Sequence, residues 1–166
     1  MAARLLELIW FMLPAYAGNM APPFVRFWHG WNRPIHRRAL GEHKTVVGFG
    51  AGVAVAIVVA FLQSRTSAAV LLWEPDAWLA IGLASGVGAL GGDAIKSFFK
   101  RRLGIAPGAP WIPADQLDFV IGALIPLAGL VRLGVSDMAL ILGVTFFADI
   151  AVNHVSFYLG VRDTKW

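Results

Sequence analysis

The sequence contains no cysteine and few charged residues. Its 166 residues include 14 lysines and arginines and 10 aspartates and glutamates, together 14% of the chain. The lack of cysteine excludes disulfide bonds and thiolate chemistry. A charged share of 14% lies well below the roughly 25% of an ordinary soluble domain. The composition therefore argues against a soluble globular fold.

Hydrophobic residues take the place of the missing charges. They make up 58% of the chain, and the mean hydropathy is +0.68. These values predict an all-α integral membrane protein with a single transmembrane domain, residues 1–166. Five apolar runs predict a bundle of five transmembrane helices, joined by polar loops at about 21–45 and 94–115. The predicted spans are about 4–20, 46–62, 77–93, 116–132 and 135–159.

The first apolar run is open to two interpretations. It is short, contains Glu7 and Pro14, and spans a membrane only if it extends toward Pro22. Arg4, the apolar core and Ala15-Tyr16-Ala17 also imitate the three parts of a signal peptide.

The distribution of lysine and arginine predicts the orientation. With five spans and the N-terminus outside, only Arg4, Arg65 and Arg132 of the 14 cations would lie outside the cell. The loops and the C-terminus would then be cytoplasmic, which counts against the signal peptide. The cations lie in short segments between apolar runs, a distribution that is typical of membrane proteins. The net charge of +4 therefore does not favour nucleic-acid binding.

Carboxylates and cations gather in the stretch from Gly91 to Asp118. On a helix continuing through Asp93, the side chains of Lys96 and Lys100 lie within about 100° of that aspartate. Ser97 shares this arc and Arg101 lies at its edge. The basic run at 100–102 taken alone is typical of a simple cytoplasmic anchor.

Two further aspartates begin the next apolar run. Asp115 and Asp118 stand three residues apart, so their carboxylates point the same way. Three carboxylates gathered with Asp93 would repel one another, and a divalent cation would relieve that repulsion. Oxygen ligands supplemented by substrate phosphates are what Mg²⁺ accepts. The stretch therefore predicts a magnesium and phosphate site at the membrane surface.

The fifth apolar run contains Asp149, with Thr145, Asn153 and Ser156 within about 40° of it on a helical wheel. An ionisable residue at this depth is a functional hypothesis. Hydrogen bonding to a neighbouring helix is an equal alternative. His154 points roughly 140° away from Asp149 and is more typical of an interfacial residue.

The central motif resembles the signature of membrane CTP-dependent cytidylyltransferases, the family of phosphatidate cytidylyltransferase. The short archaeal branch, CDP-archaeol synthase, is the more similar one. The matching residues are Gly92-Asp93, Ser97, Lys100-Arg101 and Asp115-Gln116-Leu117-Asp118, then Asn19 and Pro22, then Gly41, Lys44, Thr45 and Gly48, and finally Asn153-His154. The ester-lipid enzymes have His-Gly-Gly where this chain has Ile112-Pro113-Ala114, and arginine in place of Gln116. The ester-lipid enzymes are also longer. The differences in motif and in length both favour the ether-lipid branch.

The resemblance implies that the phosphate of digeranylgeranylglyceryl phosphate attacks the α-phosphorus of CTP with Mg²⁺ as cofactor, at a cytoplasmic site. It implies metal ligands, catalytic residues and substrate-binding residues. The metal ligands would be Asp93, Asp115 and Asp118; the catalytic residues Asp93, Lys100 and Asp118; and the substrate-binding residues Asn19, Lys44, Thr45, Lys96, Ser97, Arg101, Asn153 and His154. A CTP-dependent polyprenol kinase, a phosphatidate cytidylyltransferase for ester lipids and a small transporter or channel remain as alternatives.

Overall fold

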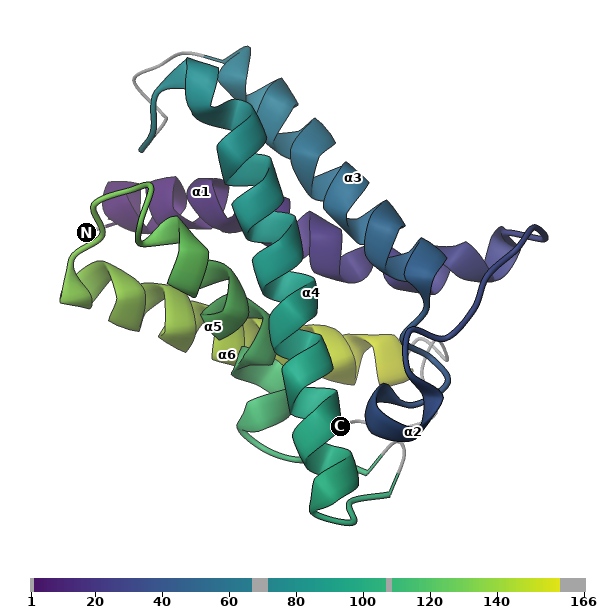
Figure 1. Cartoon of the computed structure of the whole chain (residues 1–166). Coiled ribbons are helices and arrows are strands. Elements are labelled where there is room, and N and C mark those ends of the chain that lie inside the picture. The colour runs from purple at the N-terminus through teal and green to yellow at the C-terminus, as the bar shows by residue number, and fades with distance from the viewer. Residues whose placement is uncertain (1, 67–71, 107–108, 159–166) are drawn as a thin grey trace.

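The computed structural model describes residues 2–66, 72–106 and 109–158, which form an all-α fold (Figure 1). Long helices are joined by short helical turns, one of them, η1, between the first two α-helices. The elements are α1 (Ala2–Met20), η1 (Pro22–Phe27), α2 (Arg37–Leu40), α3 (Val46–Ser64), η3 (Pro75–Ala77), α4 (Trp78–Arg102), α5 (Ala114–Leu127) and α6 (Val135–Tyr158).

A helix covers each of the five predicted apolar runs, with two differences in length. α4 continues past the predicted end at residue 93 to Arg102, so most of the cationic stretch is helical. No glycine or proline interrupts the chain between Asp93 and Arg102, and the helix ends just before Gly104, whose φ is +70°. α5 ends at Leu127, short of the predicted 132, directly after Pro126. Residue 159 of the predicted fifth span lies outside the described residues.

Three helical segments of the described chain are long and apolar enough to cross a membrane: Val46–Ser64, Pro75–Arg102 and Val135–Val155. α5 has 14 residues, which at about 1.5 Å each reach about 21 Å, less than the roughly 30 Å hydrocarbon core. α1 carries Arg4 and Glu7 within its first two turns. The all-α membrane class is thus supported, whereas five complete spans stay a prediction.

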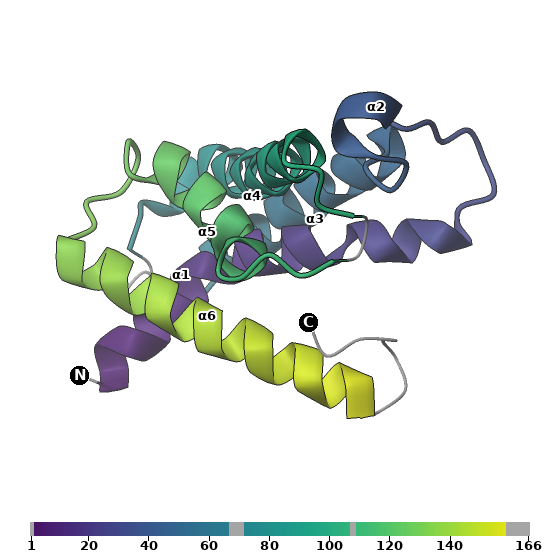
Figure 2. The same ribbon diagram turned by 90° about the horizontal axis from the view of Figure 1, so that it is seen from below.

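α4 is the central helix of the bundle. It packs against α1, α2, α3 and α5, and Figure 1 shows α3 running beside it with α1 crossing both. Figure 2 shows α6 lying across α1 on the side away from α4. Three small residues of α3 that stand four apart, Gly48, Gly52 and Ala56, are buried. Small side chains therefore let the long helices of this membrane protein approach closely.

The closest approach between α4 and α5 occurs at glycines. A Cβ atom built on Gly92 would overlap the backbone oxygen of Asp118, and one built on Gly88 would lie 2.5 Å from the backbone oxygen of Gly122. Only residues without a side chain allow the two backbones to touch here. This contact places Asp93, the next residue on α4, against the first turns of α5.

We expect Gly92→Ala to destabilise the bundle, because the obstructing atoms belong to the backbone of α5 and cannot turn aside. Overpacking of this kind costs about 1–3 kcal/mol. Gly91→Ala is the matched control, since a Cβ there meets nothing within 4 Å and alanine favours the helix by up to about 1 kcal/mol. Melting temperatures of the two variants in detergent check this. Equal melting temperatures would contradict the packing described.

Candidate active site

Three aspartates from two helices converge on one ammonium group. Lys96 Nζ lies 3.3 Å from Asp93 Oδ1, 3.0 Å from Asp115 Oδ1 and 2.8 Å from Asp118 Oδ2. Asp93 and Lys96 lie on α4, and the other two residues lie in the first turns of α5. The Lys96 and Asp118 side chains are only 16% and 6% exposed. The geometry confirms that the carboxylates of the two helices face one another. We call Asp93, Lys96, Asp115 and Asp118 the aspartate cluster.

Lys100, one turn after Lys96, contacts both the loop between α4 and α5 and the aspartate cluster. Its ammonium group donates to both carboxylate oxygens of Asp115 at 3.0 Å and to the backbone oxygen of Ala109 at 2.6 Å. The backbone N–H of Trp111 donates to Asp115 Oδ2 at 2.6 Å. Burial alone would raise the pKa of Asp115, but the hydrogen bond from Lys100 and the charge of Lys96 outweigh it, so its pKa lies below the usual value. Asp115 is therefore ionised at neutral pH.

Lys44 reaches the cluster from the segment before α3 and forms an ion pair with Asp93. Backbone bonds hold this segment: Ile35 N–H donates to Lys44 O at 2.8 Å. Thr45 caps α3, its Oγ1 accepting from Gly48 N–H at 3.1 Å. The predicted glycine-lysine-threonine element is thus the start of a helix, where an N-cap threonine satisfies a free N–H group. It brings Lys44 to the carboxylate expected to bind metal.

The aspartate cluster has the donor chemistry that Mg²⁺ accepts, since its ligands are ionisable carboxylates. In the described residues, however, no three aspartate, glutamate or histidine side chains stand close enough to hold a metal ion as they are. Lys96 Nζ takes the point on which the carboxylates converge. Mg²⁺ binding therefore stays a prediction, and it would require this ammonium group to turn away from the carboxylates.

Comparison with known proteins agrees with the motif. A family model described as CarS-like CDP-archaeol synthase matches residues 1–166. The chain belongs to the CDP-archaeol synthase family. The CDP-archaeol synthase of Methanospirillum hungatei is 35% identical over 170 residues, which cover 93% of this chain and 100% of the relative. That of Thermococcus onnurineus is 34% identical, with 99% and 98% covered.

A solved structure extends the similarity to the fold. It belongs to an intramembrane enzyme for archaeal membrane lipid biosynthesis, superposes with a TM-score of 0.75 and is 31% identical, covering 90% of this chain and 94% of that one. The predicted resemblance to the archaeal branch is thereby confirmed. Together with the long apolar helices, the match identifies this member of the CDP-archaeol synthase family as an integral membrane protein.

The remaining residues predicted for the synthase site are spread over the helices. Ser97 is buried in α4 and Asn19 stands at the end of α1, next to the glycine that packs on α3. On α6, Asn153 Nδ2 donates to Asp149 Oδ2 at 2.8 Å, and His154 Nδ1 lies 2.8 Å from Ile150 O. These bonds run along α6, so a substrate role for its residues stays a prediction.

One residue of the polar stripe on α6, Thr145, contacts a neighbouring helix. Thr145 is buried, donates to Ile141 O at 2.7 Å and lies 2.8 Å from the hydroxyl of Tyr16 on α1. Thr145 therefore hydrogen-bonds a neighbouring helix, whereas the two interpretations of Asp149 stay open.

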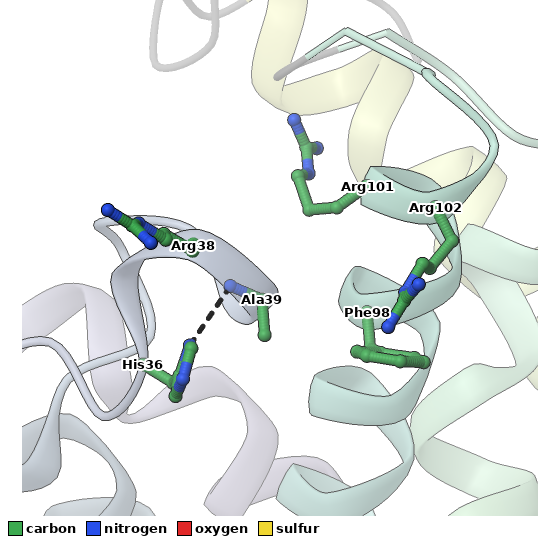
Figure 3. A pocket seen from close by; sticks show the side chains of 6 residues that line it. All are labelled: His36, Arg38, Ala39, Phe98, Arg101 and Arg102. Carbon is green, nitrogen blue, oxygen red and sulfur yellow. Dashed lines mark hydrogen bonds between the residues drawn. The ribbon is translucent and has the colours of Figure 1, made fainter.

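Sequence reasoning missed a basic pocket beside the C-terminal end of α4. It is lined by His36, Arg38, Ala39, Phe98, Arg101 and Arg102 (Figure 3). Arg101 was predicted to bind substrate, whereas His36, Arg38 and Arg102 were not singled out. The signal available was two basic runs, at 37–38 and 100–102, in separate segments. Only the packing of α2 against α4 joins them.

Proposed function

We propose that this chain transfers the cytidylyl group of CTP to digeranylgeranylglyceryl phosphate, an isoprenoid ether-lipid phosphate, and so makes CDP-archaeol and pyrophosphate. One observation carries the proposal: the convergence of Asp93, Asp115 and Asp118 with Lys96 in a buried cluster. Membership of the CDP-archaeol synthase family supports it. The motif residues that meet in space are those that the resemblance assigned to the reaction.

The reaction needs charge compensation more than acid or base catalysis. An oxygen of the lipid phosphate forms a bond to the α-phosphorus of CTP, and the bond from that phosphorus to the bridging oxygen breaks, releasing pyrophosphate. The attacking phosphate is already ionised near neutral pH, since its second pKa is about 6. No side chain has to remove a proton. The site must instead align two anions and neutralise their repulsion.

The lysines of the site supply positive charge from three positions. Lys44, Lys96 and Lys100 each contact an aspartate of the cluster, and we propose that they turn toward the triphosphate when CTP binds. Asp93, Asp115 and Asp118 would hold Mg²⁺, which when bound withdraws charge from phosphate oxygens and orients them. Lys96 is central to this exchange, because its ammonium group must leave the carboxylates before a metal ion enters.

We propose that the site faces the cytoplasm and that the N-terminus lies outside. Figure 1 shows α2 beside the C-terminal end of α4. Both elements carry cations, and Lys44 pairs with Asp93 of α4. Retention of lysine and arginine on the cytoplasmic side supports this orientation. CTP is then available from the cytosol, and the lipid phosphate from the inner leaflet. The C-terminal cations, at 162 and 165, lie outside the described residues.

Labelled CTP tests the reaction. Purified protein with Mg²⁺ and digeranylgeranylglyceryl phosphate is expected to move label from the α-phosphate of CTP into the lipid and to release γ-label as pyrophosphate. Phosphatidate serves as the ester-lipid comparison and is expected to be the poorer acceptor. Transfer of γ-label into a polyprenol would show a kinase instead. Absence of α-label from every lipid phosphate would overturn the proposed transfer.

A further inference from the structure

Exposed aromatic side chains gather in the chain between α1 and α2, outside the long helices. The side chains of Phe24, Trp28 and Trp31 are 68%, 58% and 59% exposed. Figures 1 and 2 both show this part of the chain projecting sideways beyond α3. We call residues 22–35 the aromatic segment. Apolar surface gathered in this way is typical of a site that contacts a membrane or another apolar partner.

A turn at residues 28–31 holds the two indole rings at the surface. Trp28 Nε1 donates to Trp31 O at 3.2 Å, so the indole N–H has a partner inside the turn. A Cβ atom built on Gly30 would lie 2.8 Å from the Trp28 ring, which therefore packs directly on the backbone. The turn thus gives the exposed rings a fixed arrangement.

The aromatic segment lies level with the start of a candidate transmembrane span. Val46, the first residue of the span Val46–Ser64, donates its backbone N–H to Arg33 O at 2.9 Å. Ile35 N–H donates to Lys44 O at 2.8 Å, so the segment is also bonded to the residues that carry Lys44. In Figure 1 the segment runs across the direction of α4. A segment that leaves the end of a spanning helix sideways follows the membrane surface.

The charges of the aromatic segment and its flanks are all positive. Residues 19–41 contain no aspartate or glutamate, but they include four arginines, at 26, 33, 37 and 38. The Arg33 side chain is exposed. Anionic lipid headgroups attract cations that lie close to the membrane surface, and tryptophan is enriched at the same depth. The segment therefore combines both features of a contact with anionic lipid.

We propose that the aromatic segment docks on the surface of an anionic membrane, with Phe24, Trp28 and Trp31 inserted at the level of the lipid headgroups and Arg33 beside their negative charge. The exposed rings supply the apolar contact, and the lack of acidic residues supplies the charge complementarity. Docking of this kind needs neither CTP nor a metal ion. It therefore stands or falls independently of the proposed cytidylyl transfer.

Fluorescence of a single labelled position in lipid nanodiscs tests the contact. Because the chain has no cysteine, one introduced thiol labels one site. His29→Cys, labelled with the fluorophore NBD, places the label at an exposed position of the aromatic segment and removes no aromatic ring. Glu42→Cys is the matched control, since Glu42 lies in the same loop and its carboxylate side chain is 66% exposed. In phosphatidylglycerol nanodiscs, lipids with a nitroxide near the headgroup are expected to quench the label at residue 29 and to leave the control label unquenched.

Two sets of variants in the His29→Cys protein separate the contributions of the rings and of the charge. Phe24→Ser combined with Trp31→Ser keeps the Trp28 turn and is expected to lower the quenching to the level of the control. In phosphatidylcholine nanodiscs, the ratio of docked to undocked segment, taken from the quenched fraction, is expected to be about fivefold lower, the effect of one arginine near the surface. Arg33→Gln is expected to remove most of this difference between the two lipids.

Several outcomes would overturn the proposal. Size-exclusion chromatography first establishes that each variant remains folded. Docking is then excluded if the label at residue 29 is quenched no more than the control label, or if the quenching survives the loss of Phe24 and Trp31. Equal quenching in the two lipids would overturn the preference for anionic headgroups. Protection of the label at residue 29 from iodide in water, without quenching by the nitroxide lipids, would indicate a protein contact in place of the membrane.

Discussion

Asp93→Asn is expected to lower the rate of cytidylyl transfer by about 10²- to 10³-fold, the loss typical of removing one group that stabilises developing charge. The substitution keeps the size of the side chain and removes its negative charge. In the structure that charge pairs with both Lys44 and Lys96. An amide is also a poorer Mg²⁺ ligand than a carboxylate. The variant therefore loses a proposed metal ligand and the partner of two lysines.

Release of pyrophosphate from CTP in the presence of lipid phosphate measures the effect. Asp76→Asn is the matched control, because Asp76 is an exposed aspartate at the opposite end of the α4 span. It is expected to keep the activity of the unmodified protein. Size-exclusion chromatography of Asp93→Asn establishes that the variant remains folded. Activity of folded Asp93→Asn within a few-fold of the unmodified protein would remove Asp93 from the proposed chemistry.

The faces of the individual helices could be predicted from the sequence. Helical periodicity is local, so spacing alone placed Lys96 and Lys100 on the side of Asp93, and Asp115 beside Asp118. The structure confirms these placements. The family was also predicted correctly, because its motif consists of short groups of residues whose spacing is visible in one chain.

The contacts between helices could not be predicted in the same way. Lys96 lies among three carboxylates because α4 and α5 touch at Gly92. The sequence of a single helix does not show how that helix will be aligned against its neighbour. The basic pocket depends on α2, a helix of four residues that is too short to show a periodic pattern. α5 ends at Leu127, so this helix is shorter than the full transmembrane span that the apolar composition of the segment predicted.

Replacement of Lys96, which lies among three carboxylates, is expected to lower the stability of the protein strongly. Lys96→Met replaces the ammonium group by an apolar side chain of similar length and leaves three carboxylates facing one another with little solvent. Removing one partner of a buried ion pair costs about 3–5 kcal/mol. The melting temperature in metal-free detergent solution is therefore expected to fall clearly.

Divalent cations distinguish this explanation from a simple packing defect. If the carboxylates of Asp93, Asp115 and Asp118 lack only a positive charge, Mg²⁺ added without nucleotide is expected to raise the melting temperature of Lys96→Met more than that of the unmodified protein. Lys100→Met is the matched control, because Lys100 is also buried on α4 but contacts a single carboxylate among the described residues, that of Asp115. It is expected to respond less to Mg²⁺. A Lys96→Met protein that Mg²⁺ does not stabilise would mean that the aspartates do not form a metal site when the lysine is gone.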